Sequence, residues 1–220
     1  MEGMEPDLVR RLAHVRWIGG GSGAGKSTLA RRIARRHGAR LYDTDAAMPD
    51  HAARCPPDRC PRLAAFARAD MDARWVHPTP EAMLDAFHWF AGEGFDLIVE
   101  DLLALPRDRP VVAEGFRLLP DAVAPLLTGR AGTVWLLPTP AMRRHAFAAR
   151  GTLWEIPNRT SDPARALANL LARDTLFTER LRARTARLGL AALSVKPETG
   201  VARAERWVEA ALFRAAPPVR

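Results

Sequence analysis

Short apolar runs alternate with stretches of helical spacing along this chain. The runs that have the composition of buried strands end near glycine, proline or acidic residues. They occupy residues 14–20, 39–45, 109–116, 131–138 and 190–195. Strands that alternate with helices form a parallel sheet with helices on both faces. The pattern therefore predicts an α/β protein with three layers and a five-stranded parallel sheet.

Helical spacing predicts the elements between those strands. The best defined helix covers residues 27–37, with Leu29 and Ile33 on one face and Gly38 after its last turn. Further helices are expected at 6–13, 62–75, 80–92, 95–105, 141–151, 160–189 and 200–213. The stretch 49–61 is rich in Pro, Asp and Arg, and we expect a loop there. No repeat interrupts this order, so we expect a single domain over residues 1–220.

Composition and charge narrow the class of protein. The hydrophobic fraction of 48% and the charged fraction of 26% are those of an ordinary globular protein. No apolar run approaches the roughly 20 residues of a membrane helix, and the N-terminus lacks the layout of a signal peptide. We therefore expect a cytoplasmic protein, monomeric or homodimeric, with no membrane partner. The net charge of +8 is spread over several predicted helices, so a nucleic-acid partner is not expected.

The two cysteines, Cys55 and Cys60, lie with His51 in the spacing H-x3-C-x4-C. This spacing supplies three metal ligands at most, whereas a structural zinc site usually has four. A permanent disulfide is not expected in a cytosolic protein. We expect a proline-rich surface loop that carries two thiols, and metal binding and pairing remain the alternatives.

The clearest chemical signal lies in the turn after the first strand. Residues 20–27 match the phosphate-binding pattern G-x-x-x-x-G-K-[ST] in full, and a predicted helix follows. Glycines let the backbone wrap a phosphate chain with its N–H groups pointing inward, and the helix adds the positive end of its dipole. Lys26 would contact the β- and γ-phosphates, Ser27 would bind Mg²⁺, and Thr28 would lie near the α-phosphate. The predicted nucleotide-binding residues are Gly20, Gly21, Ser22, Gly23, Ala24, Gly25, Lys26, Ser27 and Thr28.

On this motif the chain resembles the P-loop nucleoside-triphosphate-binding proteins. The N-K-x-D motif of Ras-type GTPases does not occur in it; the nearest stretch is V-K-P-E at 195–198. No apolar strand ends in Asp-Glu, as it does in ATPase motors. The small-molecule kinases of the P-loop class fit better. The resemblance implies the three-layer P-loop fold with a helical lid, and ATP and Mg²⁺ as cofactors.

Acidic residues after the second and third strands agree with the kinase branch. The stretch "LYDTD" resembles the D-x-D of shikimate kinase-like and gluconate kinase-like enzymes, which implies that Asp43 lies near Mg²⁺ and that Asp45 orients or deprotonates the acceptor hydroxyl. The stretch "VVAEGF" resembles uridine kinase-like and adenylate kinase-like enzymes. That likeness implies that Glu114 lies at the metal and that Arg117 contacts an acidic acceptor. The alternative is that these carboxylates only cap the turns that follow them.

Arginines beyond the fourth strand suggest a lid. The stretch "VWLLPTPAMRRHAFAARG" resembles the strand, helix and lid of nucleotide kinases. The resemblance implies a lid over 143–175, in which Arg143 and Arg150 stabilise the transferred phosphoryl group and help to exclude water. Residues 49–105 would form a helical segment over the acceptor, where Arg74 would pair with an anionic group.

These expectations add up to an ATP-dependent phosphotransferase that acts on a small molecule. A nucleoside or nucleotide is the first choice of acceptor. One alternative is a kinase for a non-nucleotide hydroxyl, such as a shikimate- or gluconate-like metabolite or an antibiotic. Another is a regulatory protein that binds ATP without catalysis. The D-x-D favours a hydroxyl acceptor, whereas Glu-Gly-Phe and Arg117 favour a nucleotide.

Overall fold

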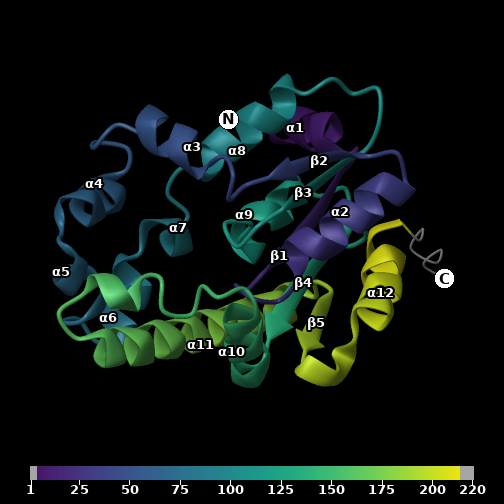
Figure 1. Cartoon of the computed structure of the whole chain (residues 1–220). Coiled ribbons are helices and arrows are strands. Elements are labelled where there is room, and N and C mark those ends of the chain that lie inside the picture. Colours follow the sequence, from purple (N-terminus) through teal and green to yellow (C-terminus); the bar gives the residue numbers. More distant parts are fainter. Residues whose placement is uncertain (1–3, 214–220) are drawn as a thin grey trace.

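Five parallel strands form one sheet in the order β2-β3-β1-β4-β5 (Figure 1). The computed structural model describes residues 4–213. The strands are β1 (Val15–Gly20), β2 (Arg40–Asp43), β3 (Val111–Glu114), β4 (Thr133–Pro138) and β5 (Ala192–Val195). Each lies within a run from which a strand was predicted, and helices cover both faces of the sheet. The predicted α/β class with a five-stranded parallel sheet is therefore confirmed.

Apolar side chains leave the sheet alternately on its two faces. In β4, Trp135 and Leu137 pack into one core, whereas Val134 and Leu136 pack into the other. The first core includes residues from the helices α1 (Met4–Leu12), α8 (Phe95–Ala104), α9 (Pro120–Val123) and α11 (Pro163–Leu188). The second includes residues from α2 (Lys26–Arg36) and α12 (Val201–Phe213). Because both faces are buried, the inner strands are almost continuously apolar.

The direction in which successive strands are added to the sheet reverses beside the glycine turn. From β1 the chain passes to β2 on one side of the sheet, and from the neighbouring strand β4 it passes to β5 on the other. Open parallel sheets bind ligands outside the carboxyl ends of their strands at such a point. The register brings Asp43 level with Glu114, and Ile18 level with Glu114 from the other side. The ends of β1, β2 and β3 therefore meet at one edge.

Ion pairs join the two helices of the second core. Arg32 and Arg36 of α2 contact Glu205 of α12, with N–O distances of 2.6 and 2.7 Å, and Arg36 also pairs with Glu209 at 2.7 Å. Helix α2 ends as predicted, because Gly38 follows it with φ of 59°. Part of the chain's basic charge thus serves to hold helices together.

A run of short helices separates β2 from β3 and lies to one side of the sheet in Figure 1. Before α8 it comprises α3 (Met48–Arg54), α4 (Pro61–Arg68), α5 (Met71–Trp75), α6 (Pro80–Ala86) and α7 (His88–Ala91). The expected loop over 49–61 is wrong in its first half, because α3 accommodates Pro49 in its first turn, where proline costs no hydrogen bond. Two predicted helices are divided, since Asp70 caps α5 and Phe87 is extended.

Cys55 and Cys60 form a disulfide, so the expectation of two thiols is wrong. After α3 ends, the chain turns at Pro56 and Pro57 and brings the two Cα atoms to 5.9 Å. His51, the histidine of the H-x3-C-x4-C spacing, is buried, and its Nε2 lies 2.7 Å from Asp101 Oδ2. The group therefore contributes to packing between α3, α4 and α8.

The remaining long helices lie in the C-terminal half of the chain and pack against the sheet. Helix α10 (Pro140–Ala149) follows β4, and the 26-residue α11 runs from the short helices to the sheet core. Asp162 caps α11 by accepting from the Arg165 N–H at 3.0 Å.

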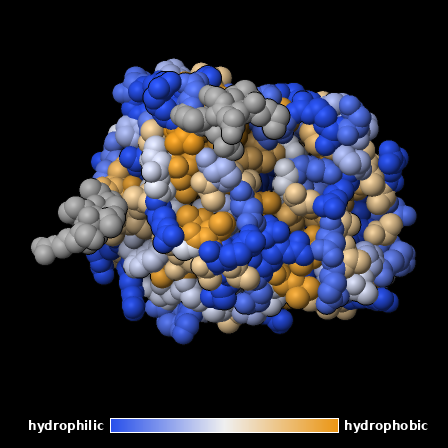
Figure 2. Space-filling model, turned by 180° about the vertical axis from the view of Figure 1, so that it is seen from behind, coloured by the Kyte–Doolittle hydropathy of each residue, from blue (hydrophilic) through white to orange (hydrophobic). Residues whose placement is uncertain are grey.

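Seen from behind, the surface is largely hydrophilic with separate apolar patches (Figure 2). Within residues 4–213, no helix combines the length and the apolar character that crossing a membrane requires.

Candidate active site at the carboxyl edge of the sheet

The glycine loop between β1 and α2 adopts a backbone that other residues would strain. Gly20, Gly23 and Gly25 have φ of 128°, 82° and 82°. A Cβ on Gly20 would also collide with the backbone of Leu136 in β4. Gly25 precedes α2 without any side-chain cap, so the first N–H groups of that helix remain free to bind an anion.

Lys26 lies buried beneath this loop. Its Nζ donates to the Gly21 carbonyl at 3.0 Å, and it forms no ion pair with the described part of the chain. Burial lowers the pKa of Lys26, although the charges of Asp45 and Glu114 oppose that effect. The positive charge therefore sits close to two carboxylates without being neutralised by a direct contact.

Glu114 is fully buried at the end of β3. Neither of its carboxylate oxygens has a hydrogen-bond partner in residues 4–213. Burial raises the pKa of Glu114, and the Ser27 hydroxyl and the Lys26 charge only partly offset this. Buried carboxylates without partners are costly, so this one indicates a missing cationic or hydrogen-bonding group.

We expect Glu114→Gln to stabilise the ligand-free protein at neutral pH. Lys26 is the nearby cation among three carboxylates, so removing one negative charge relieves repulsion. Because the folded-state pKa of Glu114 is raised, its stabilising contribution is present in acid and is lost as pH rises through that pKa. Urea unfolding should show a gain of about 1 kcal/mol at pH 7.5 that shrinks toward pH 4.

The control for this prediction is Glu179→Gln, because Glu179 forms an exposed pair with Arg182. That substitution should change the free energy of unfolding little at either pH. A Glu114→Gln protein that is less stable than the wild type at pH 7.5 would show that the carboxylate has a structural partner.

Asp43 and Asp45 divide two tasks at the end of β2. Asp43 Oδ1 accepts from the N–H groups of Asp45 and Ala46 at 2.9 and 3.1 Å, so Asp43 does cap the turn. Asp45 accepts only a long 3.4 Å hydrogen bond, from the Thr44 hydroxyl. Burial raises the pKa of Asp45, while the Lys26 charge lowers it. Asp43 thus stabilises the turn on which Asp45 lies.

Gly115, the residue after Glu114, leaves room for that turn. It has φ of 148°, and a Cβ there would collide with the Thr44 hydroxyl and lie 3.1 Å from Asp45 Oδ1. We expect Gly115→Ala to displace Asp45 and, on the phosphotransferase function proposed below, to lower the rate of acceptor phosphorylation by about 10²-fold. A coupled assay of ADP release measures this.

Gly129→Ala is the matched control, because a Cβ at Gly129 meets nothing within 4 Å. It should leave the rate unchanged. Equal rates for the Gly115→Ala protein and the wild type would mean that the turn does not position a reacting group.

No three side chains of His, Cys, Asp or Glu within residues 4–213 lie close enough to hold a metal by themselves. The oxygen-bearing side chains near the loop instead fit a Mg²⁺ ion that is bound partly by phosphate. Such an ion keeps several waters and uses one or two carboxylates. The unpartnered oxygens of Glu114 and the nearby Ser27 hydroxyl agree with this type of site.

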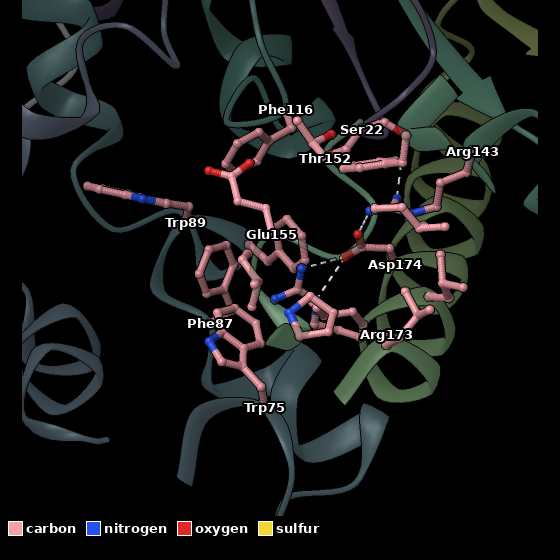
Figure 3. Close-up of a pocket in the computed structure, with 18 of the residues that line it drawn as sticks. Ser22, Trp75, Phe87, Trp89, Phe116, Arg143, Thr152, Glu155, Arg173 and Asp174 are labelled. Carbon is pink, nitrogen blue, oxygen red and sulfur yellow. Dashed lines mark hydrogen bonds and ion pairs between the residues drawn. The ribbon is translucent and has the colours of Figure 1, made fainter. Parts of the chain in front are cut away.

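Two cavities open beside the glycine loop. The first, about 500 Å³, has Ser22 and Arg143 at its end nearest the loop and Trp75 and Phe87 at its other end (Figure 3). We call it the aromatic cavity. Met48 also lines it, and the Met48 N–H donates to the Asp45 carbonyl at 3.3 Å. The cavity therefore begins within one turn of Asp45.

The second cavity, about 340 Å³, lies between the start of α2, helix α10 and the connection from β5 to α12. Gly25 and Thr28 line one side, Arg150 lines another, and residues 195–201 complete the wall. We call it the loop cavity. Its position beside the glycine loop makes it the nearest space for a group attached to phosphates held there.

Asp174 of α11 joins two arginines in the wall of the aromatic cavity (Figure 3). Arg143 contacts one of its carboxylate oxygens, and Arg173 contacts the other with N–O distances of 2.7 and 2.8 Å. Arg143 also approaches the Ser22 carbonyl at 3.5 Å. All three residues are buried, and burial lowers the pKa of both guanidinium groups.

The other predicted arginines lie in three different places. Arg150 is exposed at the end of α10, where its charge still acts on Lys26. Arg117 is buried, stacks 3.9 Å from the Trp89 ring, and donates to two backbone carbonyls. Arg74 stacks 4.7 Å from the Phe66 ring and lines a separate cavity of about 440 Å³. The structure thus groups Lys26 with the three predicted carboxylates. Arg117 supports the backbone of the turn between Asp43 and Asp45 through the Thr44 carbonyl, whereas Arg74 lines a different cavity.

Sequence reasoning did not single out Asp174 or His88. A signal for the first was present, because Arg173 and Asp174 interrupt the buried face of α11 between Ala166 and Phe177. A charged pair on an otherwise apolar helical face indicates a buried ion pair. The place of His88 depends on how short helices pack, and no local pattern marks it.

Comparisons with protein-family models and with curated protein sequences gave no match to this chain.

Proposed function

We propose that this protein is an ATP- and Mg²⁺-dependent phosphotransferase that transfers the γ-phosphoryl group to a hydroxyl of a small molecule. The observation that carries the proposal is the meeting of three features at one edge of the sheet. These are a complete G-x-x-x-x-G-K-S loop in a left-handed glycine conformation, an unneutralised Lys26, and Glu114 with no partner.

The glycine loop would bind the phosphates. The free N–H groups at the start of α2 and the dipole of that helix favour an anion at this place. Lys26 would exchange its hydrogen bond with the Gly21 carbonyl for contacts with the β- and γ-phosphates. A buried ammonium gains most from such contacts, because burial has already removed its water.

Ser27, Glu114 and Asp43 would hold Mg²⁺ together with the phosphates. The metal would neutralise charge that develops on the phosphoryl oxygens. Glu114 would relieve its own burial by interacting with the metal's water shell. Asp43 keeps one oxygen on the backbone of the following turn, so its other oxygen is the one available for such a water.

Asp45 would orient the acceptor hydroxyl and accept its proton. The acceptor oxygen bonds to the γ-phosphorus, the bond from that phosphorus to the bridging oxygen breaks, and ADP leaves. Burial raises the pKa of Asp45, which makes it a better proton acceptor than an exposed aspartate. Its single weak hydrogen bond leaves it free for this task.

The base of the nucleotide would occupy the loop cavity. Thr28 and Gly25 lie at its inner side, next to the phosphate-binding loop, and the connection after β5 forms its outer side. The predicted lid over 143–175 includes most of α10, which lines both cavities, and the first half of α11, which lines the aromatic cavity.

Calorimetry with ATP, with and without Mg²⁺, and an assay of ADP release against a panel of acceptors test the proposal together. ATP should bind in a Mg²⁺-dependent manner, and one class of acceptor should raise ADP release above basal hydrolysis. ATP binding without stimulation by any acceptor would favour the regulatory ATP-binding alternative. Absence of ATP binding would contradict both.

A further inference from the structure

The aromatic cavity is built mainly from rings and aliphatic side chains. The Phe and Trp residues in its wall are Phe66, Trp75, Phe87, Trp89, Phe90, Phe116 and Phe147. Its volume of about 500 Å³ suits a ligand with a substantial ring system. Phe116 directly follows Gly115, the residue that packs against Thr44 and Asp45, so this wall reaches the edge of the proposed transfer site.

The charged groups in the cavity wall balance in number, since Arg143 and Arg173 are matched by Asp174 and Glu155. Glu155 itself is exposed and forms no ion pair within residues 4–213. Both arginines are already bound to Asp174. Arg173 is also enclosed by the rings of Trp75, Phe87 and Phe90, with distances of 5.0 to 5.1 Å to the ring centres. Both guanidiniums are thus engaged with Asp174, and Nε of Arg143, which lacks a hydrogen-bond partner within residues 4–213, is buried.

The two further arginines near the cavity also form contacts within the protein. Arg117 is 2% exposed, and its guanidinium donates to the carbonyls of Thr44 and Gly94 while it stacks on Trp89. Arg74 lies behind Phe66 and donates to the Ala67 carbonyl at 3.0 Å. An anionic acceptor would therefore lose its hydration in this cavity without gaining a cationic partner.

His88 supplies a neutral polar group in the same wall. It is 3% exposed, and its Nδ1 has no hydrogen-bond partner in residues 4–213. Burial and the charge of Arg117 lower its pKa to about 4, so the imidazole is uncharged at neutral pH. The imidazole of His88 therefore adds a polar group but no charge to the wall of the aromatic cavity.

We propose that the acceptor is an uncharged alcohol with an apolar or aromatic ring system, bound with its ring in the aromatic cavity and its hydroxyl toward Asp45. This proposal rests on the phosphotransferase function proposed above and narrows its acceptor. Among the acceptors expected from the sequence, it retains nucleosides and neutral antibiotics. It excludes nucleotides, shikimate-like acids and polycationic antibiotics.

Five probes separate these classes: thymidine, cinnamyl alcohol, thymidine 5′-monophosphate, shikimate and kanamycin. Calorimetry with the full-length protein measures their binding without ATP, and the assay of ADP release measures transfer with ATP and Mg²⁺. Thymidine or cinnamyl alcohol should bind at least about tenfold more tightly than the monophosphate, shikimate and kanamycin. An anion finds both arginines of the wall already paired, and a polycation finds a single carboxylate, Glu155, for its several charges. The same neutral probe should stimulate ADP release.

A cavity-filling variant locates the binding. Leu167 lines the aromatic cavity, and its neighbour Ala168 is exposed on the same helix. Leu167→Trp should weaken binding of the neutral probe by about tenfold by occupying its space, with ATP affinity unchanged. Ala168→Trp should leave both affinities unchanged.

The outcomes distinguish this inference from the function on which it rests. Preference for the monophosphate, shikimate or kanamycin overturns the acceptor class even where ADP release confirms a kinase. Binding of neither neutral alcohol overturns it as well. Tight binding of a neutral alcohol that Leu167→Trp weakens, without any ADP release, upholds the ligand class and contradicts the phosphotransferase.

Discussion

Lys26→Ala should reduce acceptor phosphorylation by about 10³-fold or more, since it removes the buried cation that would follow the γ-phosphoryl group in the transition state. The protein should remain folded. Lys26 donates a single hydrogen bond, to Gly21, and burial lowers its pKa, so the ligand-free protein gains little from the charge. Single-turnover kinetics and a thermal unfolding curve on the same preparation measure both effects.

The chain offers one comparison for this substitution, because Lys occurs elsewhere only at position 196. Lys196 is exposed, lies 3.9 Å from Glu198 and lines the loop cavity, so Lys196→Ala should lower the rate only slightly when ATP is saturating. Lys26→Arg should also be inactive, because the planar guanidinium is larger than the ammonium and less able to move within the loop. If Lys26→Ala unfolds the protein, the lysine is structural and its proposed role is wrong.

Asp45→Asn should lower kcat by about 10²- to 10⁴-fold, the range in which a positioned general base contributes. The amide has nearly the shape of the carboxylate and can still accept from the Thr44 hydroxyl, so the turn should keep its geometry. ATP affinity should change little, which separates the loss from damage to the glycine loop. The measurement is kcat for the acceptor together with the dissociation constant for ATP.

The pH profile adds an independent check on Asp45. Burial raises its pKa, so the wild-type rate should begin to fall, on acidification, at a pH above that of an ordinary aspartate. Asp50→Asn is the control substitution, since Asp50 is exposed and pairs with Arg54 on the surface. An Asp45→Asn protein with the wild-type rate would remove Asp45 from the mechanism.

The elements around the glycine loop were accessible from the sequence because their signals are local. The alternation of apolar strands and amphipathic helices predicts the sheet, and the motif at 20–27 lies where a strand passes into a helix. The register of β2 against β3 then brings Asp43 level with Glu114, as the positions of these residues after their strands suggested. Short-range patterns therefore predicted the sheet and the edge at which the glycine loop and the three carboxylates meet.

The aromatic cavity was much less predictable, because its contacts join residues that are far apart in the sequence. Arg117 looked available for an anion until the structure showed it stacked on Trp89. Arg143 likewise meets Asp174 from another helix. Short helices between β2 and β3 carry weak periodic signals, and their packing against α11 decides which side chains face the cavity. No local rule specifies that packing.

The carboxylate of Asp174 has a thermodynamic consequence for the two halves of the molecule. One of its oxygens holds Arg143 beside the glycine loop, and the other holds Arg173 among the rings of the aromatic cavity. A ligand that moves Arg173 changes the electrostatic environment of the carboxylate that restrains Arg143. We therefore expect affinity at the loop and affinity in the cavity to be coupled, in which case linkage requires each ligand to change the binding of the other by the same factor.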